Sequence, residues 1–263
     1  MALTSSYTIV VALDARTVEQ FEGVWPTWRR KPGILDHPML CLCDWRSGDK
    51  HAWRRRLRWM GHPDRRLVCW DWPDRDDTAF AGMTQRERML TAFVKLPPLL
   101  VETQKWVKID TDVVATDANP WFDDDWLGLH GPRLVGSPWG YSKPADTCQR
   151  LDAWAAAIPE LGSTPSLNLP PPLPGQKRIS HPRICSWICV IDTVWSRRAA
   201  DFVPGRLPVP SQDGYHWYVA HRMGERIDRV RFGHRGWATV SKDVPRAKLV
   251  AEVLGTATEG CCG

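Results

Sequence analysis

The sequence has no apolar run long enough to cross a membrane, and it begins without the basic segment of a secretion signal. A spanning helix needs about 20 predominantly apolar residues, whereas the first apolar stretch covers only Tyr7 to Leu13. The cysteines include no C-x-x-C pair, so a zinc site is not expected. We therefore expect reduced thiols and a cytoplasmic protein with no membrane span.

The charge imbalance is also small. Lys and Arg number 35 against 30 Asp and Glu, a formal net charge of +5. This permits an anionic ligand without requiring a nucleic acid. The apolar share of 43% and charged share of 25% are typical of globular proteins, which excludes wholesale disorder. Tryptophan is abundant, at 16 residues, and indicates many amphipathic, partly buried sites.

Short apolar runs alternate with helical patterns along the chain. We expect strands at 7–13, 38–44, 66–70, 106–109, 133–137, 183–191 and 226–232, and helices at 17–30, 51–60, 84–103, 145–158, 193–202, 211–223 and 245–254. The proline-rich stretch 167–182 is expected to be a loop. This alternation predicts the α/β class, with a mainly parallel central sheet and helices on both faces.

No linker divides the chain convincingly. We expect one domain over residues 1–255, with a first half at about 1–115, a second half at about 116–255, and a flexible tail at 256–263.

The sharpest motif is WVKIDTDVVATD, from Trp106 to Asp117. An apolar strand delivers Asp110 and Asp112 at its carboxyl end, where ligands of open α/β sheets bind. Residues two apart in an extended segment point the same way. Two carboxylates on one side favour Mg²⁺ or Mn²⁺, which would bridge to a diphosphate. The alternative is an Asp-rich turn that only follows the strand.

The chain resembles the nucleotide-sugar-dependent glycosyltransferases of the GT-A fold. The resemblance covers about 7–240 and depends on four segments in the same order: YTIVVALD, KIDTD, RICSWICVID, and SQDGYHWYVA followed by RVRFGHRGW. It implies a single catalytic domain with a nucleotide-binding and an acceptor-binding half. It also implies sugar transfer from a nucleoside-diphosphate sugar, most often a UDP-sugar, with Mn²⁺ or Mg²⁺.

The resemblance also implies roles for particular residues. Asp110 and Asp112 match the DxD motif that holds the cation on the donor diphosphate, and His234 matches a histidine that completes metal coordination. Asp213 matches the base that deprotonates the acceptor in inverting members, although Gln212 stands where the family usually has Glu. A helix cap is the alternative role for Asp213, and His216 is a weaker candidate base.

The donor nucleotide would lie across the ends of the first two strands. Ala12, Leu13 and Asp14 are placed to contact the base or ribose, and Asp44 ends the second strand similarly. Alternatively, these aspartates only cap turns.

Two basic residues could reach the charged part of the donor. Lys95 could contact a phosphate from the long helix, and Arg235 could assist the leaving diphosphate. For both residues, a solvated side chain is the alternative.

The segment from His51 to Arg66 contains six arginines and two tryptophans against one aspartate. Basic residues interleaved with aromatic ones suit a phosphate backbone with stackable bases, although a solvated helix face explains the arginines too. If the segment binds a polyanion, a modified base in DNA is an acceptor that fits, and the enzyme would flip that base out of the duplex.

Two other functions compete with sugar transfer. A metal-dependent nucleotidyltransferase would also use carboxylates at a strand end, but it usually has a glycine-rich loop where this chain has LDARTVEQF. A nucleic-acid-binding protein would use the Arg/Trp-rich segment 51–66, which leaves Asp110 and Asp112 unexplained.

Overall fold

A computed structural model describes residues 4–70, 82–128, 130–162, 178–203, 207–208, 211–239 and 246–255. The expected tail at 256–263 and the greater part of the proline-rich stretch lie outside these residues.

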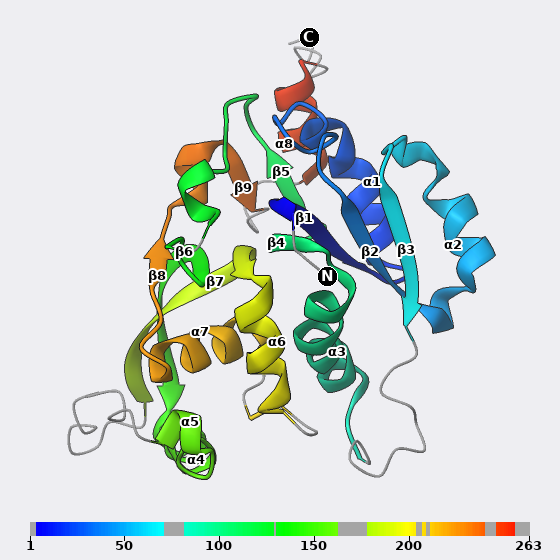
Figure 1. Ribbon diagram of the computed structural model, residues 1–263. Coiled ribbons are helices and arrows are strands. Elements are labelled where there is room, and N and C mark those ends of the chain that lie inside the picture. The colour runs from blue at the N-terminus through cyan, green and yellow to red at the C-terminus, as the bar shows by residue number, and fades with distance from the viewer. Residues whose placement is uncertain are drawn as a thin grey trace, which may run out of the picture.

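A seven-stranded sheet forms the centre of the molecule, in the order β3-β2-β1-β4-β7-β6-β8 (Figure 1). Its strands are β1 (Thr4–Leu13), β2 (Met39–Asp44), β3 (Arg65–Trp70), β4 (Thr103–Ile109), β6 (Leu134–Pro144), β7 (Arg178–Asp192) and β8 (Ile227–Arg229). The first four strands are mutually parallel, β7 runs antiparallel to both of its neighbours, and β6 and β8 are parallel. The expected mainly parallel sheet is therefore confirmed.

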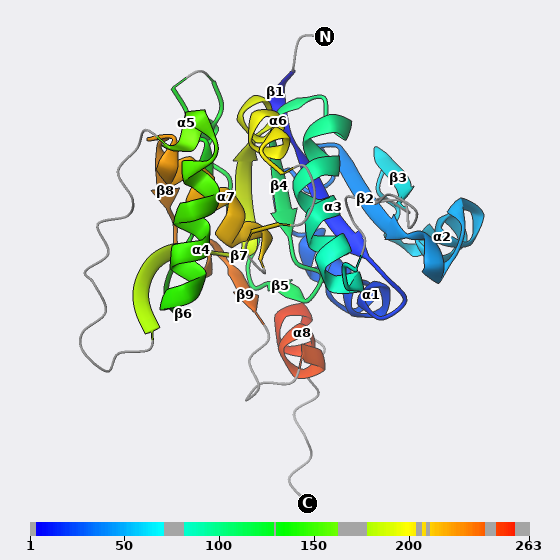
Figure 2. The same ribbon diagram turned by 90° about the horizontal axis from the view of Figure 1, so that it is seen from below.

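Helices cover both faces of this sheet (Figures 1 and 2). They are α1 (Thr17–Trp28), α2 (Lys50–Arg56), α3 (Gln85–Leu100), α4 (Ala145–Ala156), α5 (Pro159–Gly162), α6 (Thr193–Asp201), α7 (Gln212–Arg222) and α8 (Arg246–Leu254). Strand alternation makes the two-sided core, because Ile9 and Val11 pack with α1 and α2, whereas Val10 packs with α3, α6 and α7. No helix in the described part of the chain is both long enough and apolar enough to cross a membrane.

A two-stranded sheet follows the aspartate motif. Its strands, β5 (Val113–Ala115) and β9 (Trp237–Thr239), are antiparallel, with Val114 opposite Ala238. The 3-10 turn η5 (Phe232–Arg235) precedes β9. This pairing brings the end of the chain's second half next to the segment that leaves Asp112.

Several expected elements differ from the structure. The strand expected over 133–137 extends to Pro144 as β6. Residues 178–182 were expected in a loop but belong to β7, where Pro182 lies opposite Gly140 of β6. Proline is tolerated there because the described pairing of β7 with β4 begins only at Ile188, so that end of β7 has one strand neighbour. The helix expected over 51–60 ends at Arg56 and continues as the 3-10 turn η2 (Arg58–Met60). The strand expected over 226–232 shortens to β8, and η5 takes over its end.

Candidate functional site at the carboxyl edge of the sheet

The parallel strands β1, β2 and β4 end at one edge of the sheet, and two adjoining cavities lie there. The first has a volume of about 310 Å³ and the second about 320 Å³. They share Ala12, Thr17 and Met89. The first cavity is also lined by Gln20, Leu90, Phe93, Lys108, Ile109, Asp110, Thr111, Asp112 and Gln212, and the second by Leu13, Asp14, Asp44, Arg46 and Arg86.

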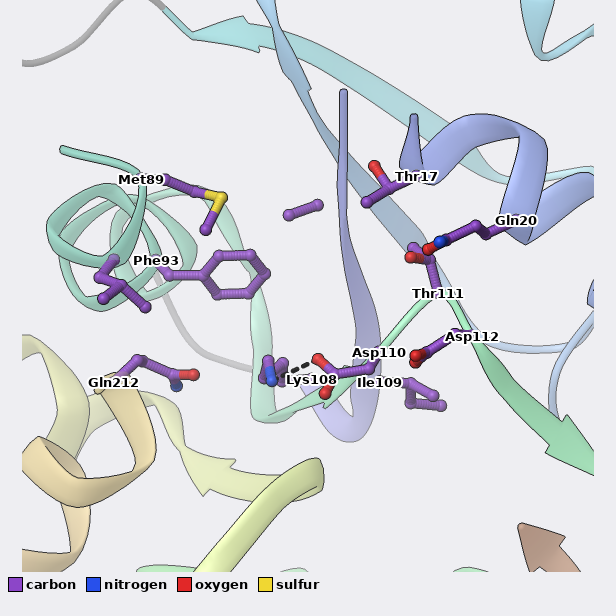
Figure 3. A pocket seen from close by; sticks show the side chains of 12 residues that line it. Thr17, Gln20, Met89, Phe93, Lys108, Ile109, Asp110, Thr111, Asp112 and Gln212 are labelled. Carbon is purple, nitrogen blue, oxygen red and sulfur yellow. Dashed lines mark ion pairs between the residues drawn. The ribbon is translucent and has the colours of Figure 1, made fainter. Parts of the chain in front are cut away.

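The first cavity contains both carboxylates of the aspartate motif (Figure 3). Asp110 follows β4 directly, and its backbone N–H donates to the Trp187 carbonyl at 2.8 Å. The Val113 N–H donates to the Asp110 carbonyl at 3.2 Å, which turns the chain into β5. The turn is thus held from β7 on one side and β5 on the other. Asp110, Thr111 and Asp112 all line this cavity, so the turn, rather than the alternation of an extended strand, brings the two carboxylates there.

Lys108 is the cationic partner of this site. Its Nζ lies 2.5 Å from Asp110 Oδ1 and 5.9 Å from the centre of the Phe93 ring. The Lys108 side chain is 11% exposed and that of Asp110 is 40% exposed. The two residues are two apart at the end of one strand, so their side chains leave the same face. Asp110 therefore enters the cavity already paired with a nearly buried ammonium.

Burial and neighbouring charges set the pKa values of this pair. Burial raises the pKa of the Asp110 carboxyl, and the opposing effect of Lys108 is smaller. Burial acts to lower the pKa of Lys108, but the charge of Asp110 and the hydrogen bond to it raise that pKa overall. The Lys108 ammonium is therefore firmly charged beside Asp110.

The donor set for a divalent cation consists of two carboxylates. In the described ranges, no three His, Cys, Asp or Glu side chains lie close enough together to hold a metal ion. His234 is exposed on η5 and does not complete such a group with Asp110 and Asp112. Proteins commonly hold Mg²⁺ through one or two carboxylates together with substrate phosphates and water. The residues present therefore fit a cation that takes its remaining ligands from a diphosphate and water.

The carboxylates of the second cavity are partly engaged by their own turns. Asp14 Oδ1 accepts from the backbone N–H groups of Arg16 at 2.9 Å and Thr17 at 2.7 Å. Although burial acts to raise it, these hydrogen bonds lower the pKa of Asp14. Asp44 is buried, and its Oδ2 lies 2.6 Å from Arg46 Nη2. The predicted residues Ala12, Leu13, Asp14 and Asp44 all line this cavity.

The start of α7 approaches the first cavity from the face of the sheet opposite α1. Gln212 lines the cavity, and its amide nitrogen lies 2.9 Å from His216 Nδ1. Asp213 is 6% exposed and close enough for its charge to act on the pKa values of Lys108 and Asp110. It lines neither cavity, so its role as a base stays a prediction.

His216 is fully buried, with ring centres 5.9 Å from Trp106 and 5.8 Å from Trp195. Burial lowers its pKa to about 3. His216 is buried and lines neither cavity, which argues against the alternative that it serves as the base.

Two predicted phosphate contacts lie away from both cavities. Lys95 is half-buried on α3, where the charge of Asp201 acts on its ammonium. Arg235 donates from Nη1 and Nη2 to the two carboxylate oxygens of Asp123, at 2.9 Å and 2.6 Å. The roles of Lys95 and Arg235 at the donor, and of His234 at the cation, stay predictions.

Sequence reasoning missed several side chains that line the first cavity, above all Lys108, Gln212, Thr17 and Gln20. The signal for Lys108 was available, because it lies two residues before Asp110 in the same strand. Gln212, by contrast, reaches the cavity only through the long-range packing of α7 onto β7.

No protein-family model and no curated protein matches the chain. Among solved structures it is similar to the mannosyltransferase Ktr4p from S. cerevisiae, with a TM-score of 0.54 and 10% identity over 86% of this chain and 67% of that one. It is also similar to core-mannan synthase A from Aspergillus fumigatus in its Mn/GDP form, with a TM-score of 0.51 and 10% identity over 82% of this chain and 70% of that one.

A weaker likeness, with a TM-score of 0.47 and 12% identity, is to the bifunctional glycosyltransferase WbbM. It covers 87% of this chain but only 40% of WbbM, so the chain spans less than half of that protein's length. At these identities the likeness establishes the fold alone. The chain has the GT-A fold found in nucleotide-sugar glycosyltransferases, which confirms the fold expected from the sequence.

Proposed function

We propose that the chain is a metal-dependent glycosyltransferase that moves a sugar from a nucleoside-diphosphate sugar, with UDP as the nucleotide we expect first. One observation carries the proposal. At the carboxyl edge of a GT-A sheet, Asp110 and Asp112 line one of two adjoining cavities, and Asp14 and Asp44 line the other. Such an edge is where open α/β sheets bind nucleotides, and the paired cavities suit a donor with two chemically different ends.

In this proposal the second cavity takes the base and ribose. Thr17 holds Asp14 through Oδ1, so Asp14 Oδ2 is a fixed acceptor for a ribose hydroxyl. Arg46 donates to both oxygens of Asp44, so a hydroxyl at Asp44 would share an oxygen with that guanidinium. Ala12 belongs to both cavities, so the nucleoside and the diphosphate would meet above it.

The diphosphate would occupy the first cavity. Asp110 and Asp112 would hold Mn²⁺ or Mg²⁺, with His234 as a third ligand if η5 approaches them. The Mn/GDP form of core-mannan synthase A supports this cation for a protein of the same fold. The bound cation would neutralise the charge that develops on the leaving diphosphate. Lys108, Lys95 and Arg235 are the protein's own cations proposed to assist.

Asp213 is the base we propose for an inverting transfer. It would accept the proton from an acceptor hydroxyl as that oxygen bonds to the anomeric carbon, while the bond from this carbon to the diphosphate oxygen breaks. A modified base in DNA is the acceptor class that the basic segment 51–66 favours.

We also propose that residues 1–255 form one catalytic domain in a reducing, cytoplasmic setting. Strands from both halves share one sheet, which supports the single domain. The free thiols of Cys41, Cys43, Cys69 and Cys189 support the reducing compartment.

The test is donor turnover. Purified protein is incubated with UDP- and GDP-sugars and Mn²⁺, and release of the nucleoside diphosphate to water or added acceptors is followed. We expect release from one nucleotide class, lost with EDTA and reduced about 100-fold or more in Asp110→Asn and Asp112→Asn. Asp125→Asn, at an exposed aspartate outside both cavities, is the matched control. Absence of release from every donor, or equal loss in the control, contradicts the proposal.

A further inference from the structure

A third cavity, of about 800 Å³, lies along the free edge of the sheet and is lined mainly by cations. Lys50 and Arg54 come from α2, and Arg65 and Arg66 come from β3; the rest of the lining is Leu67, Val68 and Cys69. Among the described strands, β3 is the end strand and pairs only with β2, and Figure 1 shows α2 beside it. We call this cavity the edge groove.

The cations of the edge groove have no carboxylate partners among the described residues. Arg65 donates to the Leu57 carbonyl, and Arg66 donates to the Leu100 carbonyl at 2.9 Å, so both guanidinium groups are held beside the strand without losing charge. The nearby Asp49 is committed to capping α2, where it accepts from Ala52 N–H at 2.7 Å.

Two half-buried arginines elsewhere in the described chain do have carboxylate partners. Arg133 lies 3.1 Å from Asp192, and Arg235 lies 2.6 Å from Asp123. Within the described residues, the four cations that line the edge groove have no such partner. An anionic partner would supply the missing charge.

We propose that the edge groove binds the phosphodiester backbone of a nucleic acid, by charge and without reading its bases. The lining follows β3 from Arg65 to Cys69, which is about 13 Å of extended chain. Over that distance one strand of B-form DNA carries roughly four phosphates. A linear polyanion thus matches the extent of the groove.

The two tryptophans of segment 51–66, Trp53 and Trp59, do not line the edge groove. Trp53 is fully buried, and its indole N–H donates to the Asp44 carbonyl at 3.1 Å. Trp59 packs on Phe21, with ring centres 5.7 Å apart. The expected stacking of bases between arginines and tryptophans is therefore wrong for Trp53, and backbone charge is the remaining means of recognition.

A membrane surface is the less suitable partner. The large apolar side chains that are exposed in the described residues are Leu99, Val194 and Leu254, and none lies on α2 or β3. The cations therefore have no apolar anchor beside them, and they line a hollow rather than a flat face.

The edge groove leads toward the candidate site. Cys69 at its end lies opposite Cys43 in the strand register, and the next pair is Trp70 with Asp44, which lines the second cavity. A bound strand would therefore pass close to the carboxyl edge of the sheet. The inference goes beyond sugar transfer and holds whether or not the chain transfers a sugar.

The experiment measures binding of the full chain to labelled single-stranded and duplex DNA of about 20 nucleotides by fluorescence anisotropy, between about 50 and 200 mM NaCl. No nucleotide sugar or metal is present, so failure of the proposed donor site cannot affect the result. The variant is Lys50→Gln with Arg54→Gln, whose side chains make no hydrogen bond or ion pair within the described ranges. The control is Arg29→Gln with Arg198→Gln, which removes the same charge from exposed positions elsewhere.

We expect the groove variant to weaken binding about tenfold or more and to lower the slope of log affinity against log salt by about 2, because two phosphate contacts are lost. The control should stay within about twofold of the unmodified chain. No DNA binding at low salt, or equal losses in both variants, would overturn the proposal. Equally strong, groove-dependent binding to anionic lipid vesicles or to polyglutamate would overturn the assignment to nucleic acid.

Discussion

The ion pair between Lys108 and Asp110 controls how much negative charge the first cavity presents. With Lys108 in place, one of the two cavity carboxylates already has a cation at 2.5 Å. The pair therefore favours a site that is completed by an anionic ligand together with a metal ion, rather than by a metal ion alone.

Replacing Lys108 should change the affinities for the metal ion and for the nucleoside diphosphate in opposite directions. In Lys108→Met we expect Mn²⁺ alone to bind more tightly, because the competing ammonium is gone. The nucleoside diphosphate should bind about tenfold more weakly at saturating metal, which corresponds to about 1.4 kcal/mol. Calorimetric titrations with each ligand measure both effects, and Lys108→Arg should stay close to the unmodified protein. Parallel changes in the two affinities would contradict this account.

His216 gives a prediction about acid stability. Its pKa of about 3 lies below the ordinary value of 6.5 because the imidazole is buried. As pH falls from 6.5 toward 3, His216 therefore becomes protonated in the unfolded chain but stays neutral in the folded chain. The stability that this histidine contributes is complete above about pH 6.5 and falls by about 1.4 kcal/mol per pH unit below it.

Urea unfolding of the unmodified chain and of His216→Gln at pH 7 and pH 4 tests this. The free energy of unfolding of the unmodified chain should fall by about 3 kcal/mol more than that of the variant, since the variant has no imidazole to protonate. Parallel losses in the two proteins would show that His216 is not buried in its neutral form.

Asp14 holds the turn that leads from β1 into α1. Asp14 accepts hydrogen bonds from Arg16 and Thr17, so the residue expected to contact the donor also shapes the start of the helix. These two uses are compatible because a carboxylate has two oxygens, and the hydrogen bonds described involve Oδ1.

Asp14→Ala should lower the free energy of unfolding by about 1–2 kcal/mol near pH 7, because two backbone donors lose their acceptor. Asp14→Ser should recover part of it. Since the pKa of Asp14 is lowered in the folded chain, the stabilisation is present above its ordinary pKa and lost as pH falls through the folded value. Denaturant curves near pH 7 and about pH 3 measure this, and a difference that does not shrink in acid would contradict the account.

The elements with a clear local pattern were predictable from the sequence. The run from Ile9 to Leu13 and the helix with Phe93 on its apolar face both fold as expected, because a continuous apolar run and an apolar helix face are both local signals in the sequence. The position of Asp110 and Asp112 was equally predictable, since acidic residues that directly follow a strand lie at an edge of the sheet.

The FGHRGW segment was not interpretable in the same way, because tertiary packing determines what its residues contact. Phe232 is buried in the core, and Arg235 pairs with Asp123. Gly236 has a φ of 69°, and a Cβ there would lie 2.0 Å from an Asp117 carboxylate oxygen. Much of the motif thus serves the packing of η5 and β9, which the sequence order alone could not reveal.

At the scale of the whole molecule, a buried ion network joins the parallel and antiparallel parts of the sheet. Lys105 of β4 is 1% exposed, and its Nζ lies 3.0 Å from Asp192 Oδ2 at the end of β7. Arg133 reaches the same oxygen at 3.1 Å, and Asp192 Oδ1 accepts from Trp195 N–H at 2.8 Å, which caps α6.

Removing Asp192 should therefore be costly. Asp192→Ala is expected to lower the free energy of unfolding by about 3–5 kcal/mol, because the buried Lys105 ammonium loses its countercharge. Asp192→Asn keeps an acceptor for the Trp195 N–H and should lose less. Urea denaturation compares the two, and a loss below about 1 kcal/mol in the alanine variant would show that the network does not join the two parts of the sheet.

Calorimetric titration of the chain with UDP and GDP, first with Mn²⁺ and then with EDTA, tests the donor site at Asp110 and Asp112. We predict micromolar binding of one nucleotide that requires the metal and is abolished in Asp112→Ala, whereas the Lys50→Gln, Arg54→Gln variant binds it normally. Nucleotide binding that is absent under both conditions, or that survives Asp112→Ala unchanged, would contradict a donor site at the carboxyl edge of this sheet.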